Sequence, residues 1–451
     1  MTSENGVRVS VARDGVEAMS ETTADRRPAT LTSFWHDLPR EGRMLLSVVG
    51  FQFLGTGLVL PFLVVYLHEI RGFALSDVGL LIGLGPLIGL LVVGPGGAVI
   101  DKYGARVVVM GSLAFLVAAD VVLAFAQTIG VATVAIVLQG AAFGVSWPAS
   151  QSLIAAAVPS ELRQRYFGVN FTLLNLGIGI GGIVGGLFVD VTRPVTFQLI
   201  YLADAVTFLP VLFLLLVPLR HLAGRPVHDD DEPPPAESYL DVLRRPAVGW
   251  MMLLSFVSSY VGYSQLNAGL QAFAREVGQI STKGLGFAYA CNTLVIVVLQ
   301  LLVLRRIEGR RRTRVICVMA LIWSVAWVLL GVSGLLPGTL GATLLVASCA
   351  SVFALGETLM QPTIPALVND LAPDHLRGRY NALSSGAFSL AAIVAPAIAG
   401  WLIGHALGSA YIVMLVAGCG AVVAVALVLE RRLPEGTNGV APTRAEESVS
   451  A

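Results

Sequence analysis

Long runs of apolar residues, separated by short polar segments, recur along the whole chain. A transmembrane helix needs about 20 mostly apolar residues to cross the hydrocarbon of a bilayer, and twelve runs reach that length. The pattern therefore predicts an all-α membrane protein with twelve transmembrane helices. These helices are expected at residues 44–68, 77–99, 106–126, 131–157, 166–190, 196–218, 248–272, 284–304, 314–334, 340–369, 380–404 and 409–430.

The polar segments divide these helices into two sets of six. Residues 1–42 are polar and mixed in charge, without an apolar core behind a basic start, and predict a cytoplasmic tail rather than a cleavable signal peptide. Residues 221–246, with His-Asp-Asp-Asp-Glu-Pro-Pro-Pro at their centre, predict a cytoplasmic linker. The linker separates six-helix bundles at 43–220 and 247–430, and residues 431–451 form a second cytoplasmic tail.

Composition agrees with a membrane protein and argues against other classes. Of the 451 residues, 55% are hydrophobic and 13% are charged, about half the charged fraction of a soluble domain. The formal net charge is +0, so there is no electrostatic case for a nucleic-acid partner. The Cys and His residues form no metal-ligand pattern, and no glycine loop has the context of a nucleotide site. We therefore expect no metal, no cofactor and no enzymatic activity.

The basic residues indicate the orientation. Of the 29 Lys and Arg residues, only Arg106 and Arg314 fall within a predicted span, each as its first residue, and all but four of the 29 belong to the tails or to the loops on the same side as the tails. The four exceptions are Arg71, Arg193, Arg275 and Lys283. The positive-inside rule then places both termini in the cytoplasm. The preference for Arg over Lys, with abundant Ala, Gly and Val, suggests a GC-rich bacterial genome, and hence a location in the plasma (inner) membrane.

An internal repeat supports the division into halves. A shift of 214 positions, without gaps, aligns the fourth and fifth helices with the tenth and eleventh. It superposes Pro148, Leu153, Pro159, Leu162, Arg163, Arg165, Tyr166 and Gly186 on Pro362, Leu367, Pro373, Leu376, Arg377, Arg379, Tyr380 and Gly400. Two halves related by an axis along the membrane normal are expected in one large transporter fold.

The loop between the second and third helices carries the most specific motif. Its sequence, Gly97-Ala-Val-Ile-Asp101-Lys102-Tyr-Gly104-Ala-Arg106, resembles GxxxD[RK]xGx[RK], the signature of the major facilitator superfamily. The resemblance covers about residues 43–430 and implies the major facilitator fold, with two pseudo-symmetric six-helix bundles. It also implies that this loop latches the two halves in the outward-facing state. The expected latch residues are Gly97, Asp101, Lys102, Gly104, Arg106, Arg163, Arg165, Arg377 and Arg379.

The fifth helix carries a pattern that resembles the antiporter motif Gx8Gx3GPx2GG of drug:proton exporters. The matching residues are Gly168, Gly177, Gly181, Gly185 and Gly186, with Gly182 at the proline position. Small residues at this spacing let helix backbones approach closely, and ordinary helix packing is the alternative interpretation. In the fourth helix, Gln139 and Gly140 match the end of the family motif RxxQG, but Ile136 replaces the arginine that the family implicates in proton coupling.

Three acidic residues lie well inside the predicted spans: Asp120, Asp204 and Glu357. A charged acid at the bilayer centre costs about 2.5–3.5 kcal/mol on insertion scales, and intramembrane acids are functional candidates by default. In the fold that the chain resembles, the first, fourth, seventh and tenth helices line the cavity. Glu357 is therefore the first candidate for proton coupling, whereas a structural role is the favoured interpretation of Asp120 and Asp204.

Polar residues concentrate in the seventh helix, where they would be unfavourable against lipid but suit a water-filled cavity. Other polar or aromatic candidates lie in the first, fourth and tenth helices. The predicted cavity residues are Gln52, Gln139, Trp147, Gln151, Tyr260, Tyr263, Gln265, Asn267 and Glu357. Individually they could equally form hydrogen bonds between helices.

These observations predict a secondary transporter that works by alternating access, as a monomer, in a lipid bilayer. The expected activity is proton-coupled efflux of a small amphipathic or drug-like compound, as in multidrug resistance, with the proton gradient as the energy source. Two alternatives stay open: a symporter or facilitator for a sugar or other nutrient, and a membrane sensor or scaffold that does not transport. Substrate identity is not encoded in any motif of this sequence.

Overall fold

The computed structural model describes residues 31–222, 239–307, 309–373, 376–434 and 437–439, and within these ranges all regular secondary structure is helical. Ten of the predicted crossings are single helices. They are α5 (Leu75–Tyr103), α6 (Ala105–Ala124), α7 (Ile129–Ala157), α8 (Ser160–Phe188), α9 (Pro194–Leu216), α13 (Thr282–Ile307), α14 (Arg312–Ser333), α15 (Leu340–Leu371), α16 (Arg377–Gly404) and α17 (Gly408–Glu430).

The first and seventh crossings are interrupted. The first consists of α3 (Arg40–Val59), a short 3-10 turn, α4 (Leu63–Val65) and the π-helical turn η2 (Tyr66–Ile70). The seventh consists of α11 (Pro246–Val261), the π-helical turn η3 (Gln265–Gly269) and α12 (Leu270–Glu276). Eleven described helical segments are long and apolar enough to cross a membrane, and the seventh crossing is missing from them because of its interruption. The continuous helix expected at 248–272 was therefore wrong in this detail.

Helices of each half contact mainly one another. In the first half, α3 packs against α8 and α9, and α6 packs against α7 and α9. In the second half, α14 packs against α15 and α17, and α11 packs against α16 and α17. The two halves meet along two long contacts, one between α5 and α16 and one between α8 and α13. The shift of 214 positions maps α8 onto α16, so the two contacts use equivalent helices.

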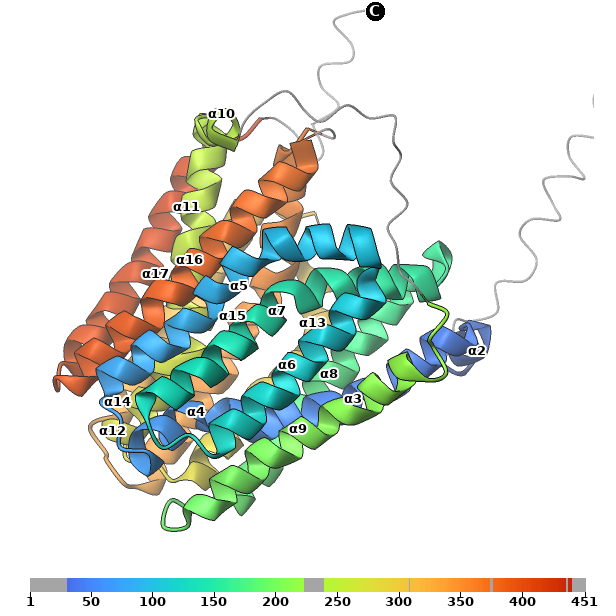
Figure 1. The fold of residues 1–451 in the computed structure, drawn as a ribbon. Coiled ribbons are helices and arrows are strands. Elements are labelled where there is room, and N and C mark those ends of the chain that lie inside the picture. The colour runs from blue at the N-terminus through green and yellow to red at the C-terminus, as the bar shows by residue number, and fades with distance from the viewer. Residues whose placement is uncertain (1–30, 223–238, 308, 374–375, 435–436, 440–451) are drawn as a thin grey trace, which may run out of the picture.

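The bundle has two ends, which we name by the chain termini. The terminal face is the end at which α3 starts and α17 finishes, and the far face is the opposite end. At the terminal face, α2 (Leu31–Asp37) and α10 (Tyr239–Leu243) lie widely apart. At the far face, α4 and α12 lie side by side and in contact (Figure 1). The halves therefore converge at the far face.

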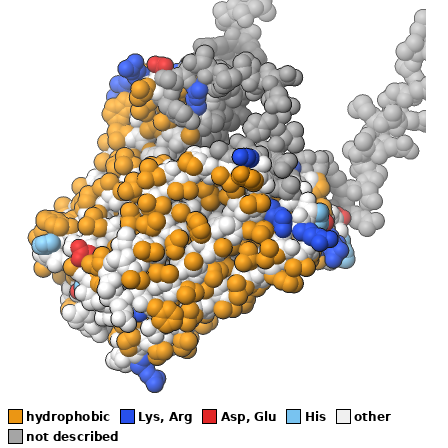
Figure 2. Space-filling view, viewed as in Figure 1, with side chains coloured by type: hydrophobic (Ala, Val, Ile, Leu, Met, Phe, Trp, Pro, Cys, Tyr) orange, Lys and Arg blue, Asp and Glu red, His pale blue; other side chains and the backbone are white. Residues whose placement is uncertain are grey.

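The surface agrees with a multi-pass membrane protein. Hydrophobic side chains cover the flanks of the helices in the view of Figure 2, and Lys and Arg side chains gather toward the ends of the bundle. Near the terminal face, α2 falls within the predicted tail 1–42, yet it packs as part of the bundle because Phe34 and Leu38 are buried among apolar side chains. Most of the predicted linker 221–246 lies outside the described residues, and α10 occupies part of its remainder.

Candidate functional site

The break in the seventh crossing begins at Gly262, which lies directly against a tryptophan. Its backbone dihedral angles, φ −103° and ψ −113°, are not helical. A Cβ at this position would lie 2.7 Å from a ring carbon of Trp323, so only glycine fits without displacing the ring. The carbonyl of Val261 accepts a hydrogen bond from Trp327 Nε1 at 3.0 Å. Two tryptophans of α14 thus stabilise the break, and π-helical turns of this kind are frequent at functional sites.

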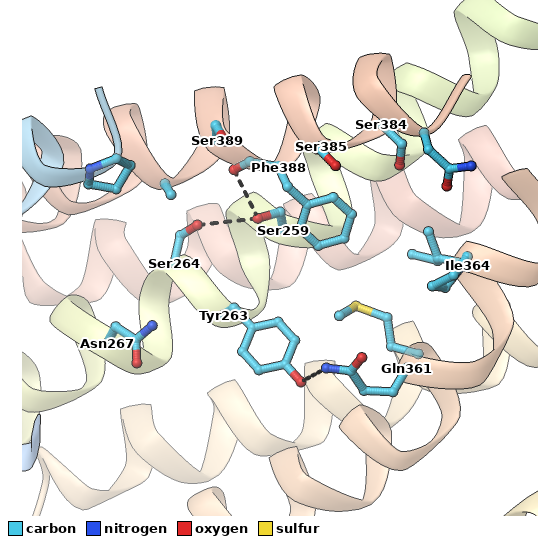
Figure 3. Close-up of a pocket in the computed structure, with 15 residues that line it drawn as sticks. Ser259, Tyr263, Ser264, Asn267, Gln361, Ile364, Ser384, Ser385, Phe388 and Ser389 are labelled. Atoms are coloured by element: carbon cyan, nitrogen blue, oxygen red, sulfur yellow. Dashed lines mark hydrogen bonds between the residues drawn. The ribbon is translucent and has the colours of Figure 1, made fainter. Parts of the chain in front are cut away.

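Residues on both sides of the break line a cavity of about 550 Å³. Its walls come from the seventh crossing, α15 and α16, and Pro86 of α5 contributes from the other half. The cavity reaches Asn381, about one turn from the start of α16 at the terminal face. Its polar lining consists of Ser259, Tyr263, Ser264, Asn267, Gln361, Asn381, Ser384, Ser385 and Ser389, and its apolar lining consists of Pro86, Met360, Ile364, Pro365, Phe388 and Ala392 (Figure 3).

Tyr263 connects this cavity to the buried acid Glu357. Its hydroxyl donates a hydrogen bond to Glu357 Oε1. The same hydroxyl accepts a hydrogen bond from Gln361 Nε2 at 2.6 Å (Figure 3). Glu357 is only 8% exposed, and its Oε2 atom has no hydrogen-bond partner among the described residues. Neither ion pairs nor cations are found around this carboxyl in the described part of the chain, so it is most stable as a neutral acid.

Two prolines in α15 lie just beyond Glu357. Pro362 and Pro365 lack the amide hydrogens that would bond to the preceding helical turn. The carbonyl of Thr358, which Pro362 leaves without its helical donor, accepts a hydrogen bond from Gln300 Nε2 of α13 at 3.4 Å. The neighbouring amide group of Asn292, also on α13, donates to the carbonyl of Ala350 at 3.1 Å. Side chains of α13 therefore satisfy carbonyls of α15 next to the acid.

The other predicted cavity residues lie in different environments. Gln265 is fully buried and its Oε1 accepts a hydrogen bond from Tyr411 at 3.0 Å. Tyr260 donates to the sulfur of Met414 at 3.2 Å. Neither residue lines the cavity, and the same holds for the predicted residues of the first and fourth crossings. These are Gln52, Gln139, Trp147 and Gln151, of which Trp147 is 64% exposed.

The structure places the remaining intramembrane acids away from this cavity. Asp120 of α6 and Asp204 of α9 lie in the interior of the first half, 1% and 3% exposed, and neither lines the cavity. The two carboxyl groups interact electrostatically with each other.

The predicted latch lies at the terminal face. Gly104 has φ +90° and joins α5 to α6, a conformation that favours glycine. Arg106 Nε donates a hydrogen bond to the carbonyl of Leu215 at 2.8 Å, and Arg163 Nε donates to the carbonyl of Val158 at 3.0 Å. Gly97, Lys102 and Arg379 belong to helices α5 and α16. The side chains of Asp101, Arg165 and Arg377 lie outside the described residues.

The glycines of α8 have three different surroundings. Gly177, Gly181 and Gly185 face backbone atoms of α3, where an added Cβ would lie closer than van der Waals contact. At Gly186 an added Cβ would lie 3.2 Å from Gly286 Cα of α13, and at Gly182 it would lie 3.8 Å from Tyr289 Cβ. Gly168 faces open space. The predicted motif therefore provides close packing within the first half and across the contact between halves.

Sequence reasoning missed a group of contacts that close the far face. Arg275 of α12 pairs with Glu69 of η2, with Arg275 Nε donating to Glu69 Oε1 at 2.7 Å. His68 Nε2 lies 3.2 Å from Glu276 Oε1, and Gln271 Nε2 donates to the carbonyl of Leu60 at 3.1 Å. Arg275 is one of the few basic residues in the loops opposite the tails, and this position could have marked it as a candidate. Its partner Glu69 could not be inferred, because it is more than 200 residues away in sequence.

Comparisons with known proteins agree with this architecture. The family model for the Major Facilitator Superfamily matches residues 45–354 and 329–450. The chain is 26% identical over 378 residues to YhjO of Bacillus subtilis (strain 168), an uncharacterized MFS-type transporter, which covers 84% of this chain and 88% of YhjO. It is 31% identical over 169 residues to the quinolone resistance protein NorA of Staphylococcus aureus (strain MRSA252), which covers 38% of this chain and 42% of NorA.

Solved structures share the fold. The nucleoside transporter NupG matches with a TM-score of 0.70 at 11% identity, over 87% of this chain and 99% of that one. A D-xylose-proton symporter matches with a TM-score of 0.67 at 18% identity, over 89% and 99% of the two chains. Together with the helical architecture and the match to the family model over most of its length, these comparisons show that the chain belongs to the Major Facilitator Superfamily of transporters.

Proposed function

We propose that this protein exports a small amphipathic or drug-like compound in exchange for protons, with Glu357 as the residue at which the two compete. The observation that carries this proposal is the hydrogen bond between Tyr263, which lines the cavity, and Glu357, which is buried behind it. A protonated Glu357 is stable in its buried site. Loss of the proton leaves a carboxylate that a cationic or hydrogen-bond-donating substrate in the cavity would stabilise through Tyr263.

The cavity lining supports an amphipathic substrate. None of the described residues that line it is charged, and Phe388, Met360 and Ile364 provide apolar surface beside a row of serines, which suits a ligand with one apolar and one polar side. The partial similarity to a quinolone resistance protein supports an exporter. In the proposed orientation the termini are cytoplasmic, the protein sits in the plasma membrane as a monomer, and the convergence of the halves at the far face corresponds to an inward-facing state.

A nutrient symporter is the second candidate. The serines, asparagines and glutamine of the lining could bind a sugar, and the structural neighbours include a D-xylose-proton symporter. The two candidates differ in direction. An exporter moves its substrate against the proton flow, whereas a symporter moves both together.

The test uses purified protein in liposomes with an imposed pH gradient and a fluorescent lipophilic cation such as ethidium. We expect the gradient to drive wild-type exchange, and we expect Glu357→Gln to abolish this drive while ethidium counterflow without a gradient persists. Asp77→Asn is the matched control, because Asp77 lies in the first turn of α5 and does not line the cavity. A Glu357→Gln protein that still follows the pH gradient would refute the proposal, and so would D-xylose moving with the protons.

A further inference from the structure

Asp120 and Asp204 form a second intramembrane site that the cavity does not use. Asp204 Oδ1 lies 3.3 Å from the hydroxyl of Thr207, which donates its shorter hydrogen bond, 2.7 Å, to the carbonyl of Asp204. Neither oxygen of the Asp120 carboxyl has a hydrogen-bond partner among the described residues. A buried ionised carboxylate without partners would be strongly unfavourable, so the protonation state of this pair needs an explanation.

A third buried group belongs to the same cluster. The hydroxyl of Tyr201, one turn before Asp204 on α9, is also without a partner among the described residues. Tyr201 is 1% exposed and interacts electrostatically with both carboxyl groups. Its ring packs against that of Tyr66, with a centroid distance of 4.9 Å. No hydrogen bond joins this hydroxyl to either carboxyl group among the described residues, so it acts on their ionised forms through its dipole.

Among the described residues, no cation compensates these acids. The packed face of α7 contributes no titratable side chain, and the first crossing contributes Tyr66 and, beyond it, Arg71. The Arg71 guanidinium donates hydrogen bonds to other groups, namely the hydroxyl of Tyr66 and the carbonyl of Ala124. Two ionised carboxylates would repel each other in this site, whereas a proton bound to either acid removes the repulsion.

We propose that Asp120 and Asp204, together with Tyr201, form a second proton-binding site in the first half of the protein. A metal ion fits less well. Ca²⁺ takes six to eight oxygen ligands, and most carbonyls of α6 and α9 are occupied by helical hydrogen bonds. The described side chains of this site offer the two carboxyl groups and the hydroxyl groups of Tyr201 and Thr207.

The pair lies on the side of the bundle that is nearer the far face. Asp120 lies about one turn before the end of α6, and the hydroxyl of Tyr66 donates to the carbonyls of Leu123 and Ala124 at that end, at 2.6 and 3.0 Å. The pair also lies against the first crossing, because a Cβ at Gly55 would lie 2.5 Å from Asp204 Oδ1. A displacement of the first crossing would therefore change the surroundings of the pair. Any role in transport stoichiometry rests on the proposed function, whereas proton binding itself does not.

Infrared difference spectroscopy of the purified full-length protein at several pH values tests this inference. The background variant is Glu357→Gln, which removes the other buried acid. We expect a protonated carboxyl band that disappears reversibly as the pH is raised, and we expect the variant that also carries Asp120→Asn and Asp204→Asn to lack this band. Asp77→Asn is the matched control, since it removes an aspartate of the same half without touching the pair, and it should retain the band.

Tyr201→Phe keeps both acids and is the alternative test variant if the asparagine variants fail to fold. It should change the pH at which the band titrates, because the hydroxyl interacts with the ionised form. A band that does not respond to pH while the protein stays folded, or a band that survives removal of both aspartates, would overturn the inference. Because Glu357 is absent from the background, this outcome does not depend on whether Glu357 couples transport. If both proposals hold, the double asparagine variant moves fewer protons per substrate than wild type.

Discussion

At the scale of single residues, Tyr263 is the group that joins cavity and acid. Tyr263→Phe removes the donor to Glu357 and the acceptor of Gln361 while keeping the aromatic ring. Leaving buried polar groups without partners costs about 1–3 kcal/mol, which corresponds to roughly 5- to 150-fold. We expect the rate of proton-driven ethidium transport to decrease by a factor within this range. The amount of folded protein, measured by size-exclusion chromatography, should not change.

The control for this prediction is Tyr260→Phe. Tyr260 is three residues earlier and donates to the sulfur of Met414 instead of lining the cavity. It should leave transport nearly unchanged, because a hydrogen bond to a thioether is weak. Equal losses in the two variants would show that the hydroxyl of Tyr263 has no special role.

At the scale of elements, the break in the seventh crossing depends on one glycine. Gly262→Ala places a Cβ against the ring of Trp323, and overpacking of this kind typically costs about 1–3 kcal/mol. We expect a lower melting temperature in detergent. Gly420→Ala is the matched control, because Gly420 of α17 faces open space. A Gly262→Ala protein as stable as Gly420→Ala would contradict the role of this contact.

The contact between α8 and α13 gives a second prediction at this scale. A Cβ at Gly286 would lie 2.6 Å from the carbonyl oxygen of Gly182, so the two backbones must separate in Gly286→Ala. We expect a shift toward a state open at the far face, detected as increased labelling of a cysteine introduced at Val64, a buried residue of α4 at that face. Gly168→Ala should have no such effect, because that member of the predicted motif contacts nothing. Unchanged labelling in Gly286→Ala would refute the role of this contact.

The crossings and their contacts show which features of the structure the sequence could predict. The hydrophobic pattern located the crossings, because length and apolarity are local properties. It did not reveal the interruption at Gly262, which depends on Trp323 about 60 residues later. It identified Glu357 and Tyr263 as candidates, but the hydrogen bond between them joins residues 94 positions apart. Polar residues of the first and fourth crossings matched the expected cavity by helix number, yet the described cavity lies almost wholly in the second half.

At the scale of the whole molecule, the pair between Glu69 and Arg275 holds the far face closed. Both side chains are mostly buried, and Arg275 also donates to the carbonyl of Ile280. We expect Arg275→Gln to open the far face, measured as a longer distance between spin labels at Thr192 and Leu335, in turns of opposite halves. The exchanged pair Glu69→Arg with Arg275→Glu should restore the shorter distance. Distances that do not change in Arg275→Gln would show that other contacts keep this face closed.

The most direct measurement concerns proton release from the isolated protein. If substrate and proton compete at Glu357, binding of a lipophilic cation such as tetraphenylphosphonium must displace a proton. Calorimetric titration in buffers of different ionisation enthalpy detects that proton. The account predicts proton release on binding to wild type and to Asp77→Asn, and binding without proton release in Glu357→Gln. Binding to wild type without proton release, or equal release in Glu357→Gln, would contradict it.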